Sequence, residues 1–221
     1  PPLPVRLVVV SPAAAGRFIT LEGGEGAGKS TQIARLKAWL EARGHRVTAT
    51  REPGGSPGAE MVRKLLVEGP AERWDGTTEA LLHFAARREH LRSTVWPALQ
   101  RGDWVISDRF ADSTLAYQGY GHGLGRGVFD TLYGVAVGDF RPDLTIVLDL
   151  PVETGLARAA ARRGSETRYE SLPRDFHERV RAAFLEIARA EPGRCVVIDA
   201  TAGIEAIADA IADAARHRLA A

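Results

Sequence analysis

The feature that most constrains the fold is a glycine-rich segment that directly follows an apolar run. Residues 22–31 read Glu-Gly-Gly-Glu-Gly-Ala-Gly-Lys-Ser-Thr, in which Gly23, Gly28, Lys29 and Ser30 satisfy the pattern GxxxxGKS. Glycines let the backbone curl so that its N–H groups point at a phosphate, while the lysine reaches the β- and γ-phosphates and the serine hydroxyl ligates Mg²⁺. The sequence therefore predicts a nucleoside triphosphate site between a strand and a helix.

Short β-branched runs recur along the chain and alternate with longer stretches whose apolar residues are spaced three to four apart, as at Ile33, Leu36 and Leu40. Strands that alternate with helices imply right-handed crossovers and a parallel sheet covered by helices on both faces. The sequence thus predicts an α/β sandwich of three layers. Its five strands are expected at Phe18–Leu21, Arg46–Thr50, Trp104–Ser107, Leu144–Leu148 and Cys195–Ile198.

The length of 221 residues fits one large α/β domain, and the sequence contains neither an internal repeat nor a linker. Residues 1–16 are rich in proline and alanine and precede the first strand, so we interpret them as an unstructured N-terminal extension. Residues 17–221 are expected to form a single domain. In such a sheet the ligand crevice lies outside the carboxyl ends of the strands.

The charges nearly cancel, since 29 Lys and Arg against 28 Asp and Glu leave a formal net charge of +1. No overall field favours nucleic acid or an anionic membrane, and we expect neither as a partner. No apolar stretch approaches the roughly 20 residues that span a bilayer. The single cysteine, Cys195, cannot form a disulfide within the chain, which fits a reducing compartment such as the cytoplasm.

Three aspartates end apolar runs, namely Asp108, Asp149 and Asp199. We favour Asp108 as the carboxylate beside the metal, because Arg109 follows it and places a phosphate-binding guanidinium at the same strand end. The other two are expected to cap loops or face solvent. Ser30 and Asp108 are therefore the predicted ligands of Mg²⁺.

Further segments indicate which family of nucleotide-binding proteins the sequence resembles. They are residues 21–31 around the glycine-rich loop, Thr50–Gly55, Ser107–Phe110 with Ser113–Gly119, Gly138–Asp143 and Val197–Thr201. Together and in this order they resemble bacterial thymidylate kinase, a family of P-loop nucleoside monophosphate kinases. The sequences Arg-Glu-Pro-Gly-Gly and Ala-Tyr-Gln-Gly are unusual outside that family. The resemblance covers residues 17–211, nearly the whole chain beyond the extension.

The resemblance implies the P-loop NTPase fold with an arginine-rich lid at about 158–170. It also implies transfer of the γ-phosphoryl group of MgATP to dTMP, giving ADP and dTDP for dTTP biosynthesis. A cytoplasmic homodimer, formed through the helices that flank Gly127–Asp139, is expected. One rival is a kinase for dUMP, dCMP or a deoxynucleoside, although a nucleoside kinase would not need both Arg51 and Arg109 for an acceptor phosphate. The other is a regulatory P-loop module without turnover, which would tolerate loss of the lid arginines.

Several roles carry over residue by residue. Glu25 matches the carboxylate that binds the 3′-hydroxyl of the acceptor sugar, and a carboxylate beside a phosphate site otherwise repels its ligand. Arg51, with Glu52 and Pro53, matches the loop at the acceptor phosphate, which Arg109 also grips. The ATP-binding residues are expected to be Gly23, Gly24, Glu25, Gly26, Ala27, Gly28, Lys29, Ser30 and Thr31.

Recognition of the base matches the family less closely. In the family a phenylalanine stacks on thymine and an arginine four residues later bonds the base. Alignment without gaps places that arginine at Arg87 and puts His83 where phenylalanine is usual, while Phe84 and Arg88 repeat the spacing one step later. We favour Arg87, with His83 or Phe84 as the stacking face. Tyr117 matches the aromatic residue that excludes a ribose 2′-hydroxyl, and Ser113, Thr114 and Gln118 match positions that line the pocket.

The segment 158–170 contains four arginines and a glycine. It reads either as a solvated helix end or as the lid that closes over ATP. Family members with an arginine in the P-loop use it for catalysis, whereas this chain has Gly26 there, so the resemblance assigns the role to the lid. Phosphoryl transfer needs positive charge on the equatorial oxygens and exclusion of water. The predicted catalytic residues are Lys29, Asp108, Arg109, Arg158, Arg162, Arg163 and Arg168.

Overall fold

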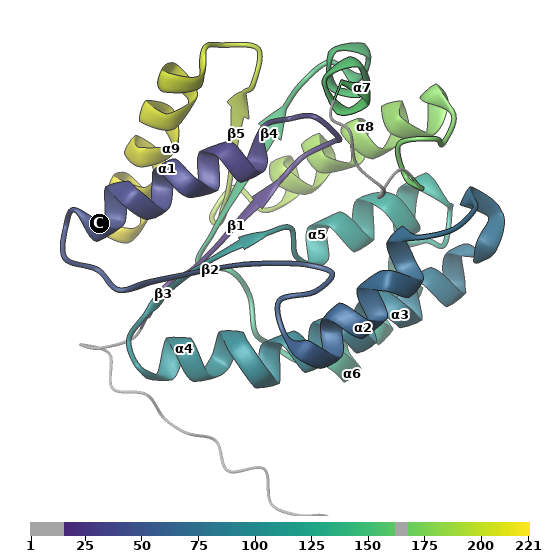
Figure 1. Ribbon diagram of the computed structural model, residues 1–221, viewed down its shortest axis with the longest axis horizontal. Helices are drawn as coiled ribbons and strands as arrows, with labels where there is room; N and C mark the ends of the chain where they lie inside the picture. Colours follow the sequence, from purple (N-terminus) through teal and green to yellow (C-terminus); the bar gives the residue numbers. More distant parts are fainter. Residues whose placement is uncertain (1–15, 162–167) are drawn as a thin grey trace, which may run out of the picture.

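The computed structural model describes residues 16–161 and 168–221, so the expected extension over 1–16 falls, apart from Gly16, outside the described residues. Five parallel strands form one sheet in the order β2-β3-β1-β4-β5 (Figure 1). The predicted five-stranded parallel sheet is therefore confirmed. Its strands are β1 (Phe18–Glu22), β2 (Val47–Arg51), β3 (Trp104–Asp108), β4 (Leu144–Asp149) and β5 (Cys195–Asp199).

The observed strands lie within one residue of the predicted ones, and each runs one residue further at its carboxyl end. The extra residue is polar or charged. The apolar pattern in the sequence therefore stops one residue before the strand does. The extra residue nevertheless pairs in the sheet, as Glu22 does opposite Val147 and Asp149 does opposite Asp199. Hydrogen bonding thus carries the strands past the point where their side chains leave the apolar core.

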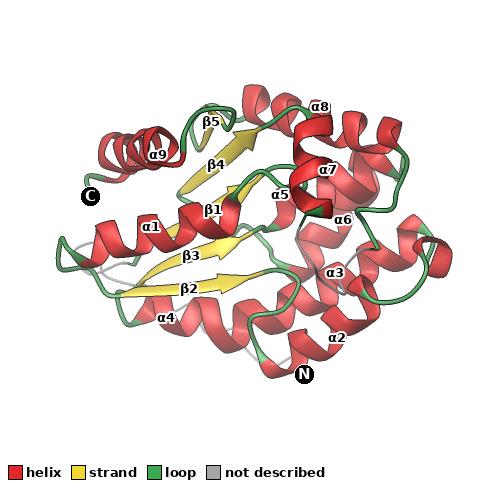
Figure 2. Cartoon of the chain, turned by 45° about the horizontal axis from the view of Figure 1, so that its top comes forward, coloured by secondary structure: helices red, strands yellow, loops and turns green. Residues whose placement is uncertain are grey.

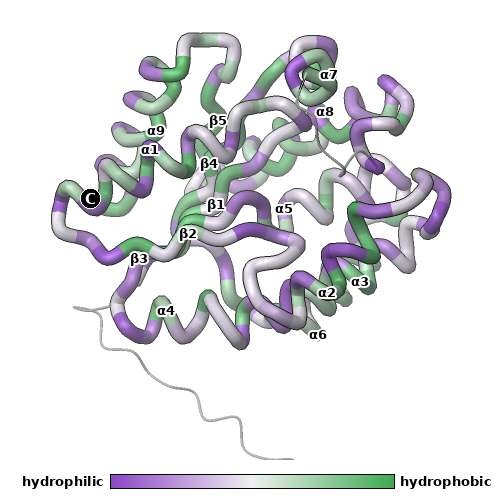
Figure 3. Tube along the Cα trace, viewed as in Figure 1, coloured by the Kyte–Doolittle hydropathy of each residue, from purple (hydrophilic) through white to green (hydrophobic). Residues whose placement is uncertain are grey.

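Helices cover both faces of the sheet, which confirms the three layers (Figure 2). On one face, α1 (Lys29–Glu41) and α9 (Ile204–Leu219) pack over Ile19 and Leu21 of β1, and they alternate apolar and polar segments in Figure 3. Phe18 of the same strand points into the cluster on the opposite face, as the alternation of a strand requires. The helices of that cluster include α3 (Gly76–His90), α4 (Trp96–Gln100), α5 (Ala111–Thr114), α6 (Arg126–Ala136) and α8 (Arg174–Ala190).

The remaining helical elements connect the strands and helices already described. They are α2 (Pro57–Val67), which packs on α3, α7 (Val152–Ala160), which follows β4, the 3₁₀-helix η1 (Ala71–Arg73), and two π-helical segments, η2 (Leu91–Val95) and η3 (Leu115–Gly121). Figure 2 shows the strand arrows pointing toward the same edge of the sheet. None of the described helices combines the length and the apolarity needed to cross a membrane.

Candidate active site

The loop between β1 and α1 is shaped by close approach to two neighbouring backbones. Gly26 has φ 68°, and a Cβ atom there would lie 2.0 Å from the carbonyl oxygen of Gly155 in α7. A Cβ at Gly23 would lie 2.5 Å from the carbonyl oxygen of Leu148. Both positions require glycine, because a side chain would collide with backbone atoms and Gly26 is also in the left-handed region. An arginine at position 26 does not fit this loop.

Lys29 begins α1 and points its ammonium group back into the loop. Its Nζ donates to the carbonyl oxygens of Gly23 at 3.2 Å and Gly24 at 3.0 Å. Burial and the nearby positive charge of Arg109 lower the pKa of Lys29 to about 8. The structure thus holds a buried cation at the amino end of a helix, where an anionic phosphate is favoured.

Ser30 and Asp108, the two predicted metal ligands, meet directly. The Ser30 hydroxyl donates to Oδ2 of Asp108 at 3.0 Å. Hard oxygen donors of this kind suit Mg²⁺, which usually takes one or two carboxylates and completes its shell with substrate phosphates and water. The described residues hold no cluster of three or more His, Cys, Asp or Glu that could bind a metal alone. The residues present therefore fit a nucleotide-bound Mg²⁺.

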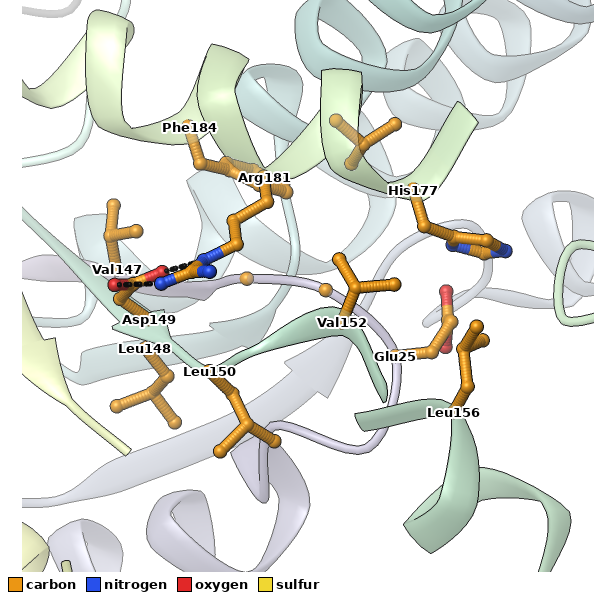
Figure 4. A pocket seen from close by; sticks show the side chains of 13 residues that line it. Glu25, Val147, Leu148, Asp149, Leu150, Val152, Leu156, His177, Arg181 and Phe184 are labelled. Carbon is orange, nitrogen blue, oxygen red and sulfur yellow. Dashed lines mark hydrogen bonds and ion pairs between the residues drawn. The ribbon is translucent and has the colours of Figure 1, made fainter. Parts of the chain in front are cut away.

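The other two strand-end aspartates are engaged elsewhere. Asp149 accepts two hydrogen bonds from Arg181, from Nε at 2.7 Å and from Nη2 at 2.9 Å (Figure 4). Asp199 accepts from the backbone N–H and the hydroxyl of Thr201, at 2.8 and 2.7 Å. Asp199 thus caps a loop as expected, whereas Asp149 forms an ion pair.

Arg109, Glu25 and Tyr117 form a connected group beside the loop. Arg109 donates through Nη2 to Oε1 of Glu25 at 3.0 Å and through Nη1 to the carbonyl oxygen of Gly23 at 2.9 Å. The Tyr117 hydroxyl donates to the same Glu25 oxygen at 2.8 Å. Burial works against ionisation of Glu25, but the positive charges of Arg109 and Lys29 outweigh it and lower the pKa to about 2. Glu25 is therefore a carboxylate throughout the neutral range.

Glu22 is a functional candidate that the sequence analysis missed. Its Oε1 accepts from the backbone N–H of Phe110 at 2.7 Å, and its Oε2 accepts from the Ser113 hydroxyl at 2.5 Å. Burial and the charge of Asp112 raise the pKa of Glu22 to about 7. It thus anchors both ends of the turn that follows Arg109. A carboxylate at the carboxyl end of β1, directly before the glycine-rich loop, is the sequence signal that could have identified it.

One cavity of about 550 Å³ collects most of the predicted site residues. It is also lined by Arg63, Val67, Tyr169 and Glu170, which were not predicted as site residues. Gly23, Gly24, Thr31, Phe84, Arg87, Thr114, Arg158 and Arg168 do not line it. The predicted residues that do are Glu25, Gly26, Ala27, Gly28, Lys29, Ser30, Arg51, Glu52, Pro53, His83, Asp108, Arg109, Ser113, Tyr117 and Gln118.

Arg87 lies buried behind this lining. Its Nε donates to Oε2 of Glu52 at 2.8 Å, and its Nη2 donates to the Thr114 hydroxyl at 3.0 Å. The third nitrogen, Nη1, is buried and has no partner among the described residues. Glu52, which lines the cavity, also accepts from Nδ1 of His90 at 2.9 Å, so it fixes Arg87 from the cavity side. Arg51 instead pairs with the half-exposed Glu60 at 3.1 Å.

The structure distinguishes the two candidate stacking residues. His83 lines the cavity, and its Nε2 lies 3.1 Å from the Tyr169 hydroxyl. Burial and the positive charge of Arg87 lower the pKa of His83 to about 3, so the ring is neutral. Phe84 is buried in the core against Phe129 and is turned away from the cavity. The interpretation of Phe84 as the stacking face therefore does not agree with the structure.

Gln118, on the π-helical segment η3, presents a bare acceptor. Its Nε2 donates to Oε2 of Glu79 at 2.8 Å, which fixes the orientation of the amide. The amide oxygen, Oε1, is buried and has no partner among the described residues. Because a buried acceptor without a donor is costly, this atom points to a ligand that donates a hydrogen bond.

The four expected lid arginines have different surroundings. Arg162 and Arg163 lie outside the described residues, and Arg158 is exposed on α7. Arg168 is buried, pairs through Nη2 with Glu79, and donates to the carbonyl oxygen of Pro70 at 3.0 Å. A buried carboxylate such as Glu79 needs a compensating charge. The position of Arg168 therefore indicates that it neutralises Glu79, and does not support the expected catalytic role.

Comparison with known proteins shows the family of the chain. The family model for thymidylate kinase matches residues 21–211. The thymidylate kinase of Caulobacter vibrioides is 56% identical over 92% of this chain and 98% of its own, and that of Rhodopseudomonas palustris is 55% identical over 92% and 90%. The crystal structure of thymidylate kinase from Ehrlichia chaffeensis aligns with a TM-score of 0.72 and 35% identity, covering 90% of this chain and 98% of that one. The chain therefore belongs to the thymidylate kinase family, the enzymes that transfer the γ-phosphoryl group of ATP to dTMP.

Proposed function

We propose that the residues of the large cavity divide this reaction between a donor half and an acceptor half. In the donor half, the loop amides, the amino end of α1 and the Lys29 ammonium hold the phosphates of ATP. Ser30 and Asp108 would hold Mg²⁺, which would supply charge neutralisation at the phosphates. The acceptor is an ionised phosphate, so no general base is needed and the protein contributes positioning and charge.

In the acceptor half, Arg109 and Arg51 grip the phosphate of dTMP, and Glu25 accepts a hydrogen bond from the sugar 3′-hydroxyl. The support for Arg109 and Glu25 is their direct contact at 3.0 Å in a buried corner of the cavity. Tyr117 donates to the same carboxylate, and we assign to its ring the exclusion of a ribose 2′-hydroxyl, the role that the family resemblance implies. Arg158, Arg162 and Arg163 remain the candidates for the cation that stabilises the transferring group.

The assignment of thymine as the base rests on Oε1 of Gln118, the buried acceptor that has no donor among the described residues. Thymine presents an N3–H donor beside the O4 acceptor, whereas cytosine presents an N3 acceptor beside an amino donor. Oε1 of Gln118 accepts from N3–H, and Nη1 of Arg87 donates to O4, which completes two buried groups that otherwise have no partner in the described chain. The neutral His83 ring supplies the stacking face.

We also propose a cytoplasmic homodimer, in keeping with the buried, free thiol of Cys195 and with apolar side chains exposed on α6 and its neighbours. Val135 is 82% exposed and Val128 42% exposed on α6, and Leu81 of the adjoining helix α3 is 52% exposed. Large apolar side chains in such numbers on adjoining helices mark a protein interface.

The test is ADP release from MgATP with dTMP, dUMP, dCMP, ribothymidine monophosphate and thymidine as acceptors. We expect dTMP to give the highest kcat/KM, and dCMP to fall at least about 100-fold below it because its base edge leaves both buried groups unpaired. Thymidine lacks the phosphate that Arg109 binds. A higher kcat/KM with dCMP or thymidine than with dTMP would overturn the acceptor assignment.

A further inference from the structure

A second, smaller cavity lies on the other side of the glycine-rich loop (Figure 4). Its volume is about 20 Å³, which is room for about one water molecule. The walls are mostly apolar and include Val152, Leu156 and Val180. Two polar side chains that enter it are already satisfied by each other, because Arg181 and Asp149 share two hydrogen bonds.

His177 of α8 also lines this cavity and is not satisfied. The residue is only 5% exposed, and its Nε2 is buried without a partner among the described residues. Burial lowers the pKa of His177 and outweighs the opposing charge of Glu25, which favours the neutral ring. Hydrogen bonds with the backbone of Leu172 and Tyr169 favour a proton on the ring. With Nε2 free, that proton belongs on Nδ1. Nε2 is then an acceptor without a donor.

The fourth polar side chain of the cavity is Glu25. Both of its donors, Arg109 and Tyr117, bind Oε1, so Oε2 is left for another donor. Figure 4 shows the Glu25 carboxylate directly beside the His177 ring, with both side chains entering the same space. Two acceptors that face one small space cannot bond each other. A single water molecule can bridge them, because it donates two hydrogens.

We propose that one water molecule in this cavity donates to Nε2 of His177 and to Oε2 of Glu25, and that His177 thereby positions the Glu25 carboxylate for the acceptor sugar. His177 touches neither the substrate nor the phosphates, so it is a positioning residue. The inference rests on the proposed function in one respect, namely that Glu25 receives the 3′-hydroxyl of dTMP.

The experiment compares dTMP with its 3′-deoxy analogue in wild type, His177→Phe and His177→Gln. Phenylalanine fills the space of the ring without an acceptor, whereas glutamine restores an oxygen near the position of Nε2. We expect His177→Phe to lower kcat/KM about tenfold for dTMP, the value of one buried hydrogen bond, and less than about twofold for the 3′-deoxy analogue. His177→Gln should recover most of the loss.

Leu156→Val is the matched control, because it alters the wall of the same cavity without touching the polar pair. It should affect the two acceptors equally. A crystal structure of the wild type should show the water within hydrogen-bond distance of both atoms, and His177→Phe should lack it.

The outcomes separate this inference from the proposed function. If wild type itself does not prefer dTMP over the 3′-deoxy analogue, Glu25 does not bind the 3′-hydroxyl and the proposed role of Glu25 fails. If wild type shows the preference but His177→Phe loses activity equally with both acceptors, His177 is only structural and the inference is wrong.

Discussion

At the scale of single residues, Arg109 shows how the site is organised before a ligand arrives. Its φ of 71° lies in the left-handed region, which is unfavourable for arginine. The backbone is held there because its N–H donates to Leu21 at 3.0 Å and its carbonyl accepts from Ser107 at 2.7 Å. The guanidinium is fixed as well, by Glu25 and Ser113. The strain is thus stored where a phosphate-binding group must keep one orientation.

Glu22 gives the first prediction, because its pKa of about 7 lies well above the ordinary value of 4.5. Between these two pH values the unfolded chain releases the proton while the folded chain keeps it, so this group makes the protein less stable as the pH rises. Glu22→Gln removes that dependence. Wild type should lose about 3 kcal/mol relative to the variant between pH 4.5 and 7.5, measured by urea unfolding.

The exposed Glu72→Gln provides the control, since it should leave the pH profile of stability unchanged. A constant difference between wild type and Glu22→Gln across this pH range would show that Glu22 is ionised in the folded protein throughout, and the prediction would be wrong.

The site residues that could be predicted without the family resemblance are those fixed by local geometry. Lys29 and Ser30 follow from the spacing of the glycine-rich loop, and Asp108 from its place at a strand end. His177 lies 152 residues beyond Glu25 and Tyr169 lies 86 residues beyond His83, and no spacing rule connects the members of either pair. Their roles depend on how α8 and the segment before it pack against the sheet, which a local pattern does not encode.

At the scale of elements, the glycine-rich loop depends on its contact with α7. Gly26 is confined by the Gly155 carbonyl, whereas a Cβ at the neighbouring Gly24 would meet no atom within 4 Å. The two positions therefore differ in whether they require glycine. Gly26 is required by packing and by its φ of 68°, and Gly24 is not required by either.

Gly26→Ala and Gly24→Ala test this difference as a matched pair. We expect Gly26→Ala to lower the free energy of unfolding by about 2 kcal/mol or more, from the left-handed backbone and the collision with α7. Gly24→Ala should change it by less than about 1 kcal/mol. Thermal unfolding of both variants is the measurement, and equal losses would contradict the packing argument.

Arg168, near the carboxyl end of the expected lid segment, allows a prediction at the scale of elements. It ties this segment to α2 and α3 through Leu66 and Glu79. Arg168→Met leaves the Glu79 carboxylate buried without its partner and should destabilise the protein by about 3–5 kcal/mol. The double variant Arg168→Met/Glu79→Gln should recover part of that loss. A catalytic arginine would behave differently, with turnover falling about 10³-fold at unchanged stability.

The strands were more predictable from the sequence than the π-helical segments. All five strands were predicted within a residue, because β-branched runs bounded by polar residues are a strong local signal in a parallel sheet. The π-helical segments η2 and η3 were not predicted, since an inserted residue in a helix leaves the apolar spacing ambiguous. The segment η3 carries Tyr117 and Gln118, so the least predictable helix contributes directly to the site.

At the scale of the whole molecule, the sheet separates two environments. Helices α1 and α9 cover one face, and the larger helical layer that includes α3 and α6 covers the other (Figure 1). The cavity lies at the carboxyl ends of β1, β2 and β3 and is also lined by residues of α2 and α3. The exposed apolar side chains of α2, α3 and α6 do not line it; they are Met61, Leu65, Leu81, Val128 and Val135. A partner that covers these side chains need not bury the residues that line the cavity.

The homodimer can be tested on this surface with Val135→Glu. Val135 is 82% exposed on α6, and a carboxylate in a dimer interface would be buried without a partner. We expect wild type to sediment as a dimer and Val135→Glu to shift toward the monomer, with a dissociation constant raised by about 100-fold or more. Ile204→Glu, on α9 at the distant edge of the sheet, has a similarly exposed apolar side chain at 53% and should remain dimeric. If both variants stay dimeric, the interface lies elsewhere; if wild type is monomeric at micromolar concentration, these apolar side chains serve another purpose.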